Sequence, residues 1–276
     1  VQEALVLKTC LNGATTMPQS LERDIADASA AGFEGVELWW DKVQAYLRDH
    51  TPADLKALLA AHKVVPVSIC PLLIWPFRDI EPARASYRAA VELAPQIGCE
   101  LVIACPDFRP ARLTRDEALA RHAVELRDLA GVAAGHGVRL AIEPIGRHTL
   151  CAGANDALQM IERAGSPDNV GVLLDTFHYF RSQVTDEELS GIPIDKLFII
   201  HVNDTEDGAI DELKDANRVY PLEGVIPLVQ MLSRVVDRGY DGYLSVEIFR
   251  PEYWAQPGAE VAARSMQSVR NLITLL

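Results

Sequence analysis

The sequence of 276 residues has few cysteines, and they form no pattern typical of a disulfide framework or a structural zinc site. The five are Cys10, Cys70, Cys99, Cys105 and Cys151. Their number is odd and no CxxC pair occurs, which favours free, partly buried thiols in a reducing compartment. We therefore expect a cytoplasmic protein.

Long apolar runs and positive charge are also scarce. No uninterrupted apolar run approaches the ~18 residues that a membrane helix needs, and no basic segment precedes an apolar stretch at the N-terminus, so we expect no membrane association. Lys and Arg number 26 against 39 Asp and Glu, a net charge of -13. Such a chain repels phosphate backbones, so nucleic acid is not expected as a partner. No glycine-rich phosphate loop is evident, which favours a non-phosphorylated substrate.

The sequence does contain a regular alternation of short apolar runs and longer helical segments. The predicted strands are 4–12, 33–39, 64–70, 100–105, 138–144, 170–176, 197–204 and 242–249. The predicted helices are 17–32, 51–62, 82–97, 114–137, 155–165, 185–191, 224–238 and 258–275. Near-continuous apolar strands between helices indicate a parallel sheet covered on both faces. Eight such units in this length predict one α/β domain over 1–276, a closed (β/α)8 TIM barrel rather than an open doubly wound sheet.

Four consecutive predicted strands end on a residue type that binds metal ions. They are Glu143 in "LAIE", Asp175 in "VLLD", His201 in "FIIH" and Glu247 in "LSVE". The active site of this barrel type lies at the C-terminal mouths of the strands. Because adjacent strands lie about 4.8 Å apart, these four side chains are able to converge on one point.

Like charges in a low-dielectric mouth repel one another, and one divalent cation among three carboxylates and an imidazole relieves that repulsion. The competing interpretation is that each acid caps a helix or pairs with an arginine. This interpretation becomes weaker when four strands in a row carry such residues. Three oxygen donors and one nitrogen favour Mn²⁺, Mg²⁺ or Co²⁺, and Zn²⁺ is also compatible.

Other side chains are expected near the same mouth: Asn12, Glu37, Trp75, Arg218 and Arg250. Asn12 and Glu37 end the first two strands, where they either contact a ligand or bind neighbouring strand ends. Trp75 either walls the pocket or packs within its loop. The two arginines either bind a substrate oxygen or pair with an acid. The irregular segment 203–223 is long enough to form a loop over the site.

Several stretches carry a family resemblance. The segments "AIEP", "VGVLLDTFHYF", "IIHVNDTEDG", "RVYPLEG" and "LSVEIFRPEYW" resemble the xylose-isomerase-like barrel superfamily of sugar isomerases and epimerases, and within it the inosose (2-keto-myo-inositol) isomerases of inositol catabolism. The resemblance covers most of the chain, from 11–16 to 249–254. "HVNDTEDG" and "FRPEYW" are its most specific parts.

The resemblance implies a single divalent metal held by Glu143, Asp175, His201 and Glu247. It further implies that His178 and Arg218 contact the substrate. The chain departs from the expected pattern near the substrate. An acid is expected before Arg218, a Trp and a Gly after it, and an acid at position 13; the chain has Asn217, Tyr220, Leu222 and Gly13. These departures concern the identity of the substrate more than the metal site.

The implied function is isomerisation of a keto-polyol, with inosose as the first candidate, through a cis-enediolate. Glu143 and Glu247 are placed to remove and return the proton while also binding metal. A ketose 3-epimerase and a keto-sugar lyase of the 3-dehydroshikimate dehydratase type are the alternatives within the enzyme class. An endonuclease IV-like nuclease is a remote alternative because strands two and three end without histidine, and a non-enzymatic binding module is another. These features are also compatible with a homodimer.

Overall fold

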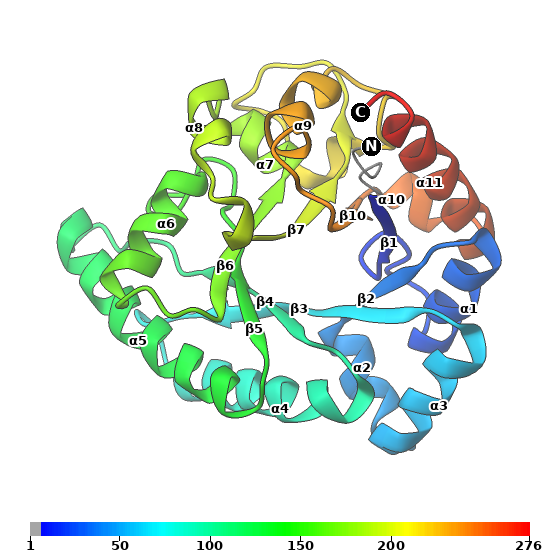
Figure 1. Ribbon diagram of the computed structural model, residues 1–276, viewed down its shortest axis with the longest axis horizontal. Coiled ribbons are helices and arrows are strands. Elements are labelled where there is room, and N and C mark those ends of the chain that lie inside the picture. The colour runs from blue at the N-terminus through cyan, green and yellow to red at the C-terminus, as the bar shows by residue number, and fades with distance from the viewer. Residues whose placement is uncertain (1–6) are drawn as a thin grey trace.

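The computed structural model describes residues 7–276, and within them eight parallel strands close into a barrel surrounded by helices (Figure 1). The strand order around the barrel is β1-β10-β7-β6-β5-β4-β3-β2. Their bounds are β1 (Lys8–Asn12), β2 (Gly35–Trp39), β3 (Val65–Ile74), β4 (Leu101–Pro106), β5 (Arg139–Ile142), β6 (Val170–Asp175), β7 (Leu197–Val202) and β10 (Tyr243–Val246). The predicted (β/α)8 barrel is confirmed. Positions 4–6 of the first predicted strand lie outside the described residues.

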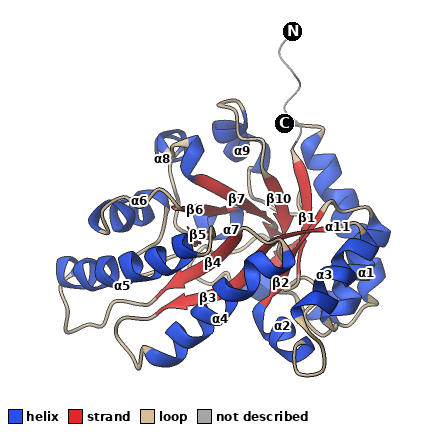
Figure 2. Cartoon of the chain, turned by 60° about the horizontal axis from the view of Figure 1, so that its bottom comes forward, coloured by secondary structure: helices blue, strands red, loops and turns tan. Residues whose placement is uncertain are grey.

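Helices form the outer layer, as Figure 2 shows in blue around the red strands. Eight of them correspond to predicted helices: α1 (Leu21–Ala31), α3 (Pro52–His62), α4 (Glu81–Ile97), α5 (Arg115–Gly135), α6 (Ala154–Arg163), α8 (Asp186–Gly191), α9 (Leu228–Val236) and α11 (Gly258–Ile273). Thr51 and Thr114 form capping boxes at the starts of α3 and α5. Among residues 7–276, no helix combines the length and apolar character needed to cross a membrane.

Several short elements were not predicted. Three are helices: α2 (Trp40–Tyr46), α7 (Thr176–Arg181) and α10 (Pro251–Trp254). The others are the strands β8 (Asp204–Thr205) and β9 (Arg218–Val219), which pair antiparallel, and the 3-10 helices η1 (Ile194–Lys196) and η2 (Asp215–Asn217). Two-residue strands and helices of less than two turns carry little hydrophobic periodicity, so a pattern in the sequence rarely reveals them. Most of them lie at the C-terminal ends of the strands, where they shape the mouth of the barrel.

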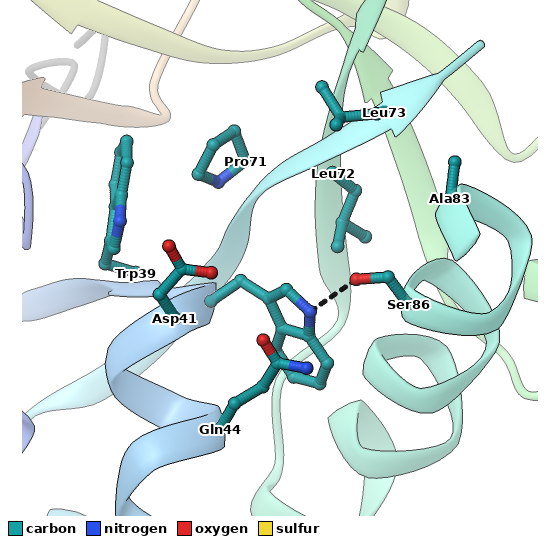
Figure 3. Close-up of a pocket in the computed structure, with 9 residues that line it drawn as sticks. Trp39, Asp41, Gln44, Pro71, Leu72, Leu73, Ala83 and Ser86 are labelled. Atoms are coloured by element: carbon teal, nitrogen blue, oxygen red, sulfur yellow. Dashed lines mark hydrogen bonds between the residues drawn. The ribbon is translucent and has the colours of Figure 1, made fainter. Parts of the chain in front are cut away.

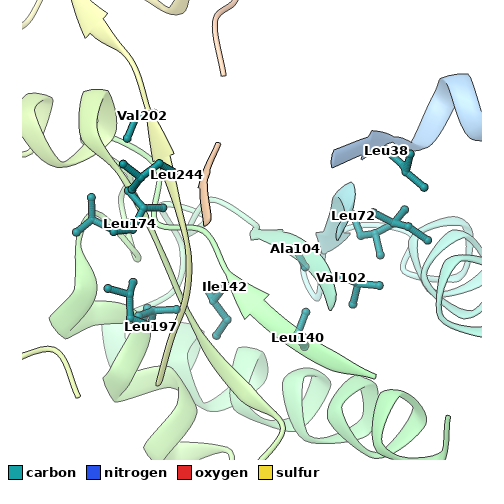
Figure 4. Close-up of a cluster of buried hydrophobic side chains, with 14 of the residues drawn as sticks. Leu38, Leu72, Val102, Ala104, Leu140, Ile142, Leu174, Leu197, Val202 and Leu244 are labelled. Atoms are coloured by element: carbon teal, nitrogen blue, oxygen red, sulfur yellow. The ribbon is translucent and has the colours of Figure 1, made fainter. Parts of the chain in front are cut away.

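Successive residues of each strand face opposite sides of the sheet, and this gives the barrel two cores. Outward side chains pack against the helices in one large buried cluster, part of which Figure 4 shows from Leu38, Leu72, Val102, Ala104, Leu140, Ile142, Leu174, Leu197, Val202 and Leu244. Inward side chains fill the barrel itself: Cys10, Val67, Cys70, Leu101, Ile103, Ala141, Leu173 and Ile199. The filled interior forms a floor, and the space above it at the strand ends is available for a site.

A buried lysine fastens the loop after β1 to α2. Lys42 donates from Nζ to the carbonyl oxygens of Gly13 at 2.8 Å and Thr16 at 2.9 Å, and to Asp24 Oδ2 at 2.6 Å. Burial raises the pKa of Asp24 to about 7, although Lys42 and Thr16 oppose this shift. Desolvation of the acid is therefore costly even with its partner in place.

We predict that Lys42→Met lowers the free energy of unfolding by about 3 kcal/mol at pH 8, because Asp24 is left buried without its cation. Without Lys42, the pKa of Asp24 in the folded protein lies far above its value in the unfolded chain, so folding favours the protonated acid. The loss of unfolding free energy relative to the wild type is therefore small at low pH and grows as the pH rises through the folded pKa. Urea unfolding at pH 6 and pH 8 measures this.

The control for Lys42→Met is Lys56→Met, which changes an exposed lysine of α3. The double variant Lys42→Met with Asp24→Asn should lose the extra pH dependence. A pH-independent deficit in the single variant would contradict the account.

Candidate metal centre

The four predicted metal ligands lie together at the C-terminal mouth of the barrel. They are Glu143, Asp175, His201 and Glu247, all buried, and their ligand atoms lie within 4.8 Å of one another. In each case the residue two positions earlier in the sequence faces into the barrel. Those earlier residues are Ala141, Leu173, Ile199 and Ser245. The strand period of two therefore turns all four inward, and Asp175 is paired with His201 across β6 and β7. Their role as ligands stays a prediction.

The imidazole of His201 is at the centre of this cluster. Its Nδ1 lies 3.1 Å from Glu247 Oε2, 3.5 Å from Glu143 Oε1 and 3.9 Å from Asp175 Oδ2. The other ring nitrogen, Nε2, lies 3.0 Å from Glu37 Oε1 on the opposite side. Glu37 thus orients the ring so that Nδ1 faces the three carboxylates, an arrangement found behind many histidine ligands.

Glu37 and Asn12 lie behind His201 and outside the residues that line the pocket. Glu37 Oε1 accepts a hydrogen bond from Asn12 Nδ2 at 3.0 Å and another from the Ser245 hydroxyl, and its Oε2 accepts from Ser68. Both residues are almost fully buried. We expected them to contact either a ligand or neighbouring strand ends, and the structure shows the second arrangement.

Negative charge exceeds positive charge in this part of the barrel. Five carboxylates lie here, from Glu37, Glu143, Asp175, Asp215 and Glu247, and Arg218 is the permanent cation among them. Burial lowers the pKa of His201, but Glu247 and Glu37 outweigh burial and hold it well above its usual range. Burial together with Glu143 raises the pKa of Glu247. Both shifts favour the protonated form, so each reduces the excess of negative charge in the cluster.

Arg218 is the largest fully buried side chain of the described residues and spans the cluster. Its Nη1 donates to Asp175 Oδ2 at 2.9 Å and to Glu247 Oε2 at 3.0 Å. Its Nε and Nη2 donate to Asp215 Oδ1 at 3.1 and 2.9 Å. Burial would raise the pKa of Asp175, but Arg218, with His178 and His201, lowers it to about 2. Asp175 is therefore a carboxylate at any working pH.

Asp175 and His178 are joined through the start of α7. Asp175 Oδ1 accepts a hydrogen bond from the backbone N–H of His178 at 2.8 Å and so caps that helix. His178 Nε2 lies 3.1 Å from Arg218 Nη2, which donates to it. Its Nδ1 is buried without a hydrogen-bond partner among residues 7–276. The alternative to metal binding was that an acid caps a helix or pairs with an arginine. Asp175 does both, but it also faces the cluster.

The donor set fits a divalent cation. Neither ring nitrogen of His201 has a well-aligned hydrogen-bond partner among the described residues, although Nδ1 lies amid three carboxylates. A cation at that point gives Nδ1 and the carboxylate oxygens a common partner and offsets their repulsion. No cysteine sulfur belongs to the set, and all five cysteines are free. This composition is typical of a catalytic rather than a structural metal site.

A cavity of about 200 Å³ opens above the cluster. It is lined by Trp39, Cys70, Pro71, Cys105, Glu143, Ile145, His178, Asp215, Arg218, Glu247 and Phe249. Its lining combines charged side chains with apolar and aromatic ones. The predicted substrate contacts His178 and Arg218 line it, and segment 203–223 delivers Arg218 and Asp215.

Sequence reasoning missed most of the apolar wall. Cys105 was interpreted as a core thiol, but its Sγ lies 3.3 Å from Glu143 Oε2 and donates to it. Trp39 stands two positions after the inward-facing Glu37, and Cys105 two positions after the inward-facing Ile103. The strand period of two could therefore have predicted that both face the cavity. Asp215 and Phe249 lie past strand ends, where no period applies.

Trp75 and Arg250 do not line this cavity. The ring of Trp75 lies under the Arg78 guanidinium, 4.3 Å from its centroid. Arg250 pairs with Glu206 at 2.6 Å and so braces segment 203–223 from outside. Trp75 therefore packs within its loop and Arg250 pairs with an acid, the second alternative stated for each, and their contact with substrate stays a prediction.

The departure at Gly13 has a steric counterpart. A Cβ added there would lie 3.0 Å from Trp39 Cβ and 3.3 Å from Asp24 Oδ2. A side chain at position 13 would therefore crowd Trp39 and require its neighbours to shift. Similarly, Leu222 stands where a glycine was expected and adopts a positive φ of 70°.

Comparison with proteins of known sequence identifies close relatives. The chain is 33% identical over 266 residues to the inosose isomerase of Halalkalibacterium halodurans, with 94% of this chain and 93% of that protein covered. It is 29% identical to a 3-dehydroshikimate dehydratase of Pseudomonas aeruginosa over 94% of this chain, but only 40% of that longer protein is covered.

Comparison with solved structures agrees with the sequence comparison. The crystal structure of the IolI protein with a bound zinc atom superposes with a TM-score of 0.89 at 28% identity, covering 97% of this chain and 98% of that one. The family model described as xylose isomerase-like TIM barrel matches residues 25–272. Because that match covers most of the chain, the protein belongs to the xylose isomerase-like TIM barrel family.

Proposed function

We propose that the chain is a divalent-metal-dependent isomerase of a non-phosphorylated keto-polyol, with 2-keto-myo-inositol (inosose) as the first candidate substrate. The observation that carries this proposal is the buried set of Glu143, Asp175, His201 and Glu247 at the floor of a small open cavity. The inosose isomerases among its relatives support the choice of substrate.

We further propose that the four side chains hold one ion, Mn²⁺, Co²⁺, Mg²⁺ or Zn²⁺. Such an ion would act as a Lewis acid that stabilises negative charge developing on the substrate's carbonyl oxygen. His201 would offer Nδ1, since Glu37 lies at Nε2. Burial of all four residues excludes bulk water from their oxygens and strengthens each electrostatic interaction.

The proton transfers are assigned to Glu143 and Glu247. Isomerisation of an α-hydroxy ketone needs a proton removed from the carbon next to the carbonyl and one returned to the neighbouring carbon. Both carboxylates line the cavity, so one is able to accept the first proton and the other to deliver the second. Burial raises the pKa of Glu247, which favours it as a base near neutral pH.

Other residues of the cavity hold the substrate. Arg218 donates to His178 Nε2, which leaves His178 Nδ1 as the N–H of a neutral imidazole. Burial lowers the pKa of His178, so this neutral form dominates. The unpartnered Nδ1–H is thus free to donate to a substrate hydroxyl.

The relation to 3-dehydroshikimate dehydratases supports a second candidate. The same proton removal followed by loss of a β-hydroxyl gives dehydration, and return of the proton to the opposite face gives epimerisation. A panel of inososes, ketohexoses and 3-dehydroshikimate, followed by NMR in D₂O, separates the three. We predict deuterium incorporation and isomerisation with an inosose. Turnover confined to 3-dehydroshikimate or to a ketohexose would overturn the isomerase assignment.

We predict that Glu143→Gln and Glu247→Gln each lower kcat by about 100-fold or more, because each removes a proton acceptor. The measurement is inosose turnover by purified variants that have been stripped with a chelator and reloaded with Mn²⁺, with bound metal quantified. Glu212→Gln, a change of an exposed acid in segment 203–223, is the matched control. Near wild-type turnover by both metal-loaded variants would refute the assignment.

A further inference from the structure

A second cavity lies directly beside the catalytic one. Its volume is about 220 Å³, and it shares Trp39 and Pro71 with the cavity above the metal centre. Figure 3 shows these two side chains on one side of the second cavity, with α2, β3 and α4 around the rest. The two spaces therefore adjoin across one indole and one pyrrolidine ring.

The base of the second cavity is apolar and held in place. Trp40, Leu72, Leu73 and Ala83 line it together with the shared residues. Trp40 Nε1 donates to Ser86 Oγ at 2.6 Å, the dashed line in Figure 3, which ties α2 to α4. The half-buried Trp39 is accessible from both cavities, so its indole offers a flat surface to a ring.

The rim of the second cavity is polar. Asp41 and Gln44 lie on the exposed side of α2 and face this cavity together with Ser86. Neither Asp41 nor Gln44 forms a side-chain hydrogen bond with another described residue, so their oxygens and the Gln44 amide are free to bind hydroxyl groups. The negative charge of Asp41 disfavours an anionic occupant.

From this arrangement we propose that the second cavity is a subsite for a hydroxylated ring attached to the keto-polyol. The ketone ring would lie over the metal centre. The attached ring would pass Trp39, place its apolar face against the indole and direct its hydroxyls to Asp41, Gln44 and Ser86. Small-molecule sites typically combine an apolar base with a small number of precisely placed polar groups. The proposal rests on the proposed function, since it extends the substrate of that same site.

The test compares three probes: unsubstituted scyllo-inosose, the same inosose with a glucosyl group on a hydroxyl remote from the ketone, and the same inosose with a cyclohexylmethyl ether there. The measured quantity is kcat/KM for enzyme-dependent deuterium exchange at the carbon next to the ketone. We expect the glucosyl compound to exceed both others by about 10-fold.

Two substitutions on the rim complete the test. Gln44→Ala should lower kcat/KM for the glucosyl compound threefold to tenfold, about the effect of one hydrogen bond, and Gln44→Trp should fill the cavity and abolish the preference. Both should leave exchange of unsubstituted inosose unchanged. Gln96→Ala, on the exposed face of α4 away from the cavity, is the matched control.

The outcomes separate this proposal from the proposed function. Exchange of unsubstituted inosose without any gain from the glucosyl group overturns the subsite and leaves the isomerase assignment in place. An equal gain from the cyclohexylmethyl ether shows that only apolar burial matters and also overturns it. Absence of exchange with all three probes overturns both proposals.

Discussion

The mutual repulsion of carboxylates buried at the barrel mouth is the constraint on which the rest of the site depends. Carboxylates in a low-dielectric environment are stable only when positive charge lies among them. Arg218 supplies one charge and contacts Asp175 and Glu247 directly. The remaining excess is visible in the upward pKa shift of His201, where protonation substitutes for a cation. A divalent ion would satisfy the same demand, and Nδ1 would then be free to bind it.

The surrounding structure supports this arrangement in two layers. Behind the cluster, Glu37 orients His201 and is itself fixed by Asn12, Ser68 and Ser245. Over the cluster, segment 203–223 holds Arg218 by means of Asp215. The cavity is also lined by Trp39, which a side chain at position 13 would crowd. In the proposed function, the charged groups would orient a bound substrate and the apolar lining would limit its shape.

The sequence predicted the barrel and the four clustered side chains because both follow from the period of the strands. A residue two positions after an inward apolar residue also points inward, and Glu143, Asp175 and His201 obey this rule. The short helix α7 escaped prediction because six residues carry little helical periodicity, and His178 lies within it. The sequence left two alternatives for Trp75 and for Arg250, because loop conformation decides which way a side chain points and no periodic pattern records it.

The central claim is that one divalent ion lies among Glu143, Asp175, Glu247 and His201 Nδ1. Anomalous X-ray diffraction from crystals loaded with Mn²⁺ or Zn²⁺, recorded at the absorption edge of the metal, tests it most directly. We predict one strong peak within bonding distance of those three carboxylates and of Nδ1, with Nε2 still beside Glu37. A peak coordinated by His178 with His201 turned away, or no peak at this position in metal-loaded crystals, would contradict the account.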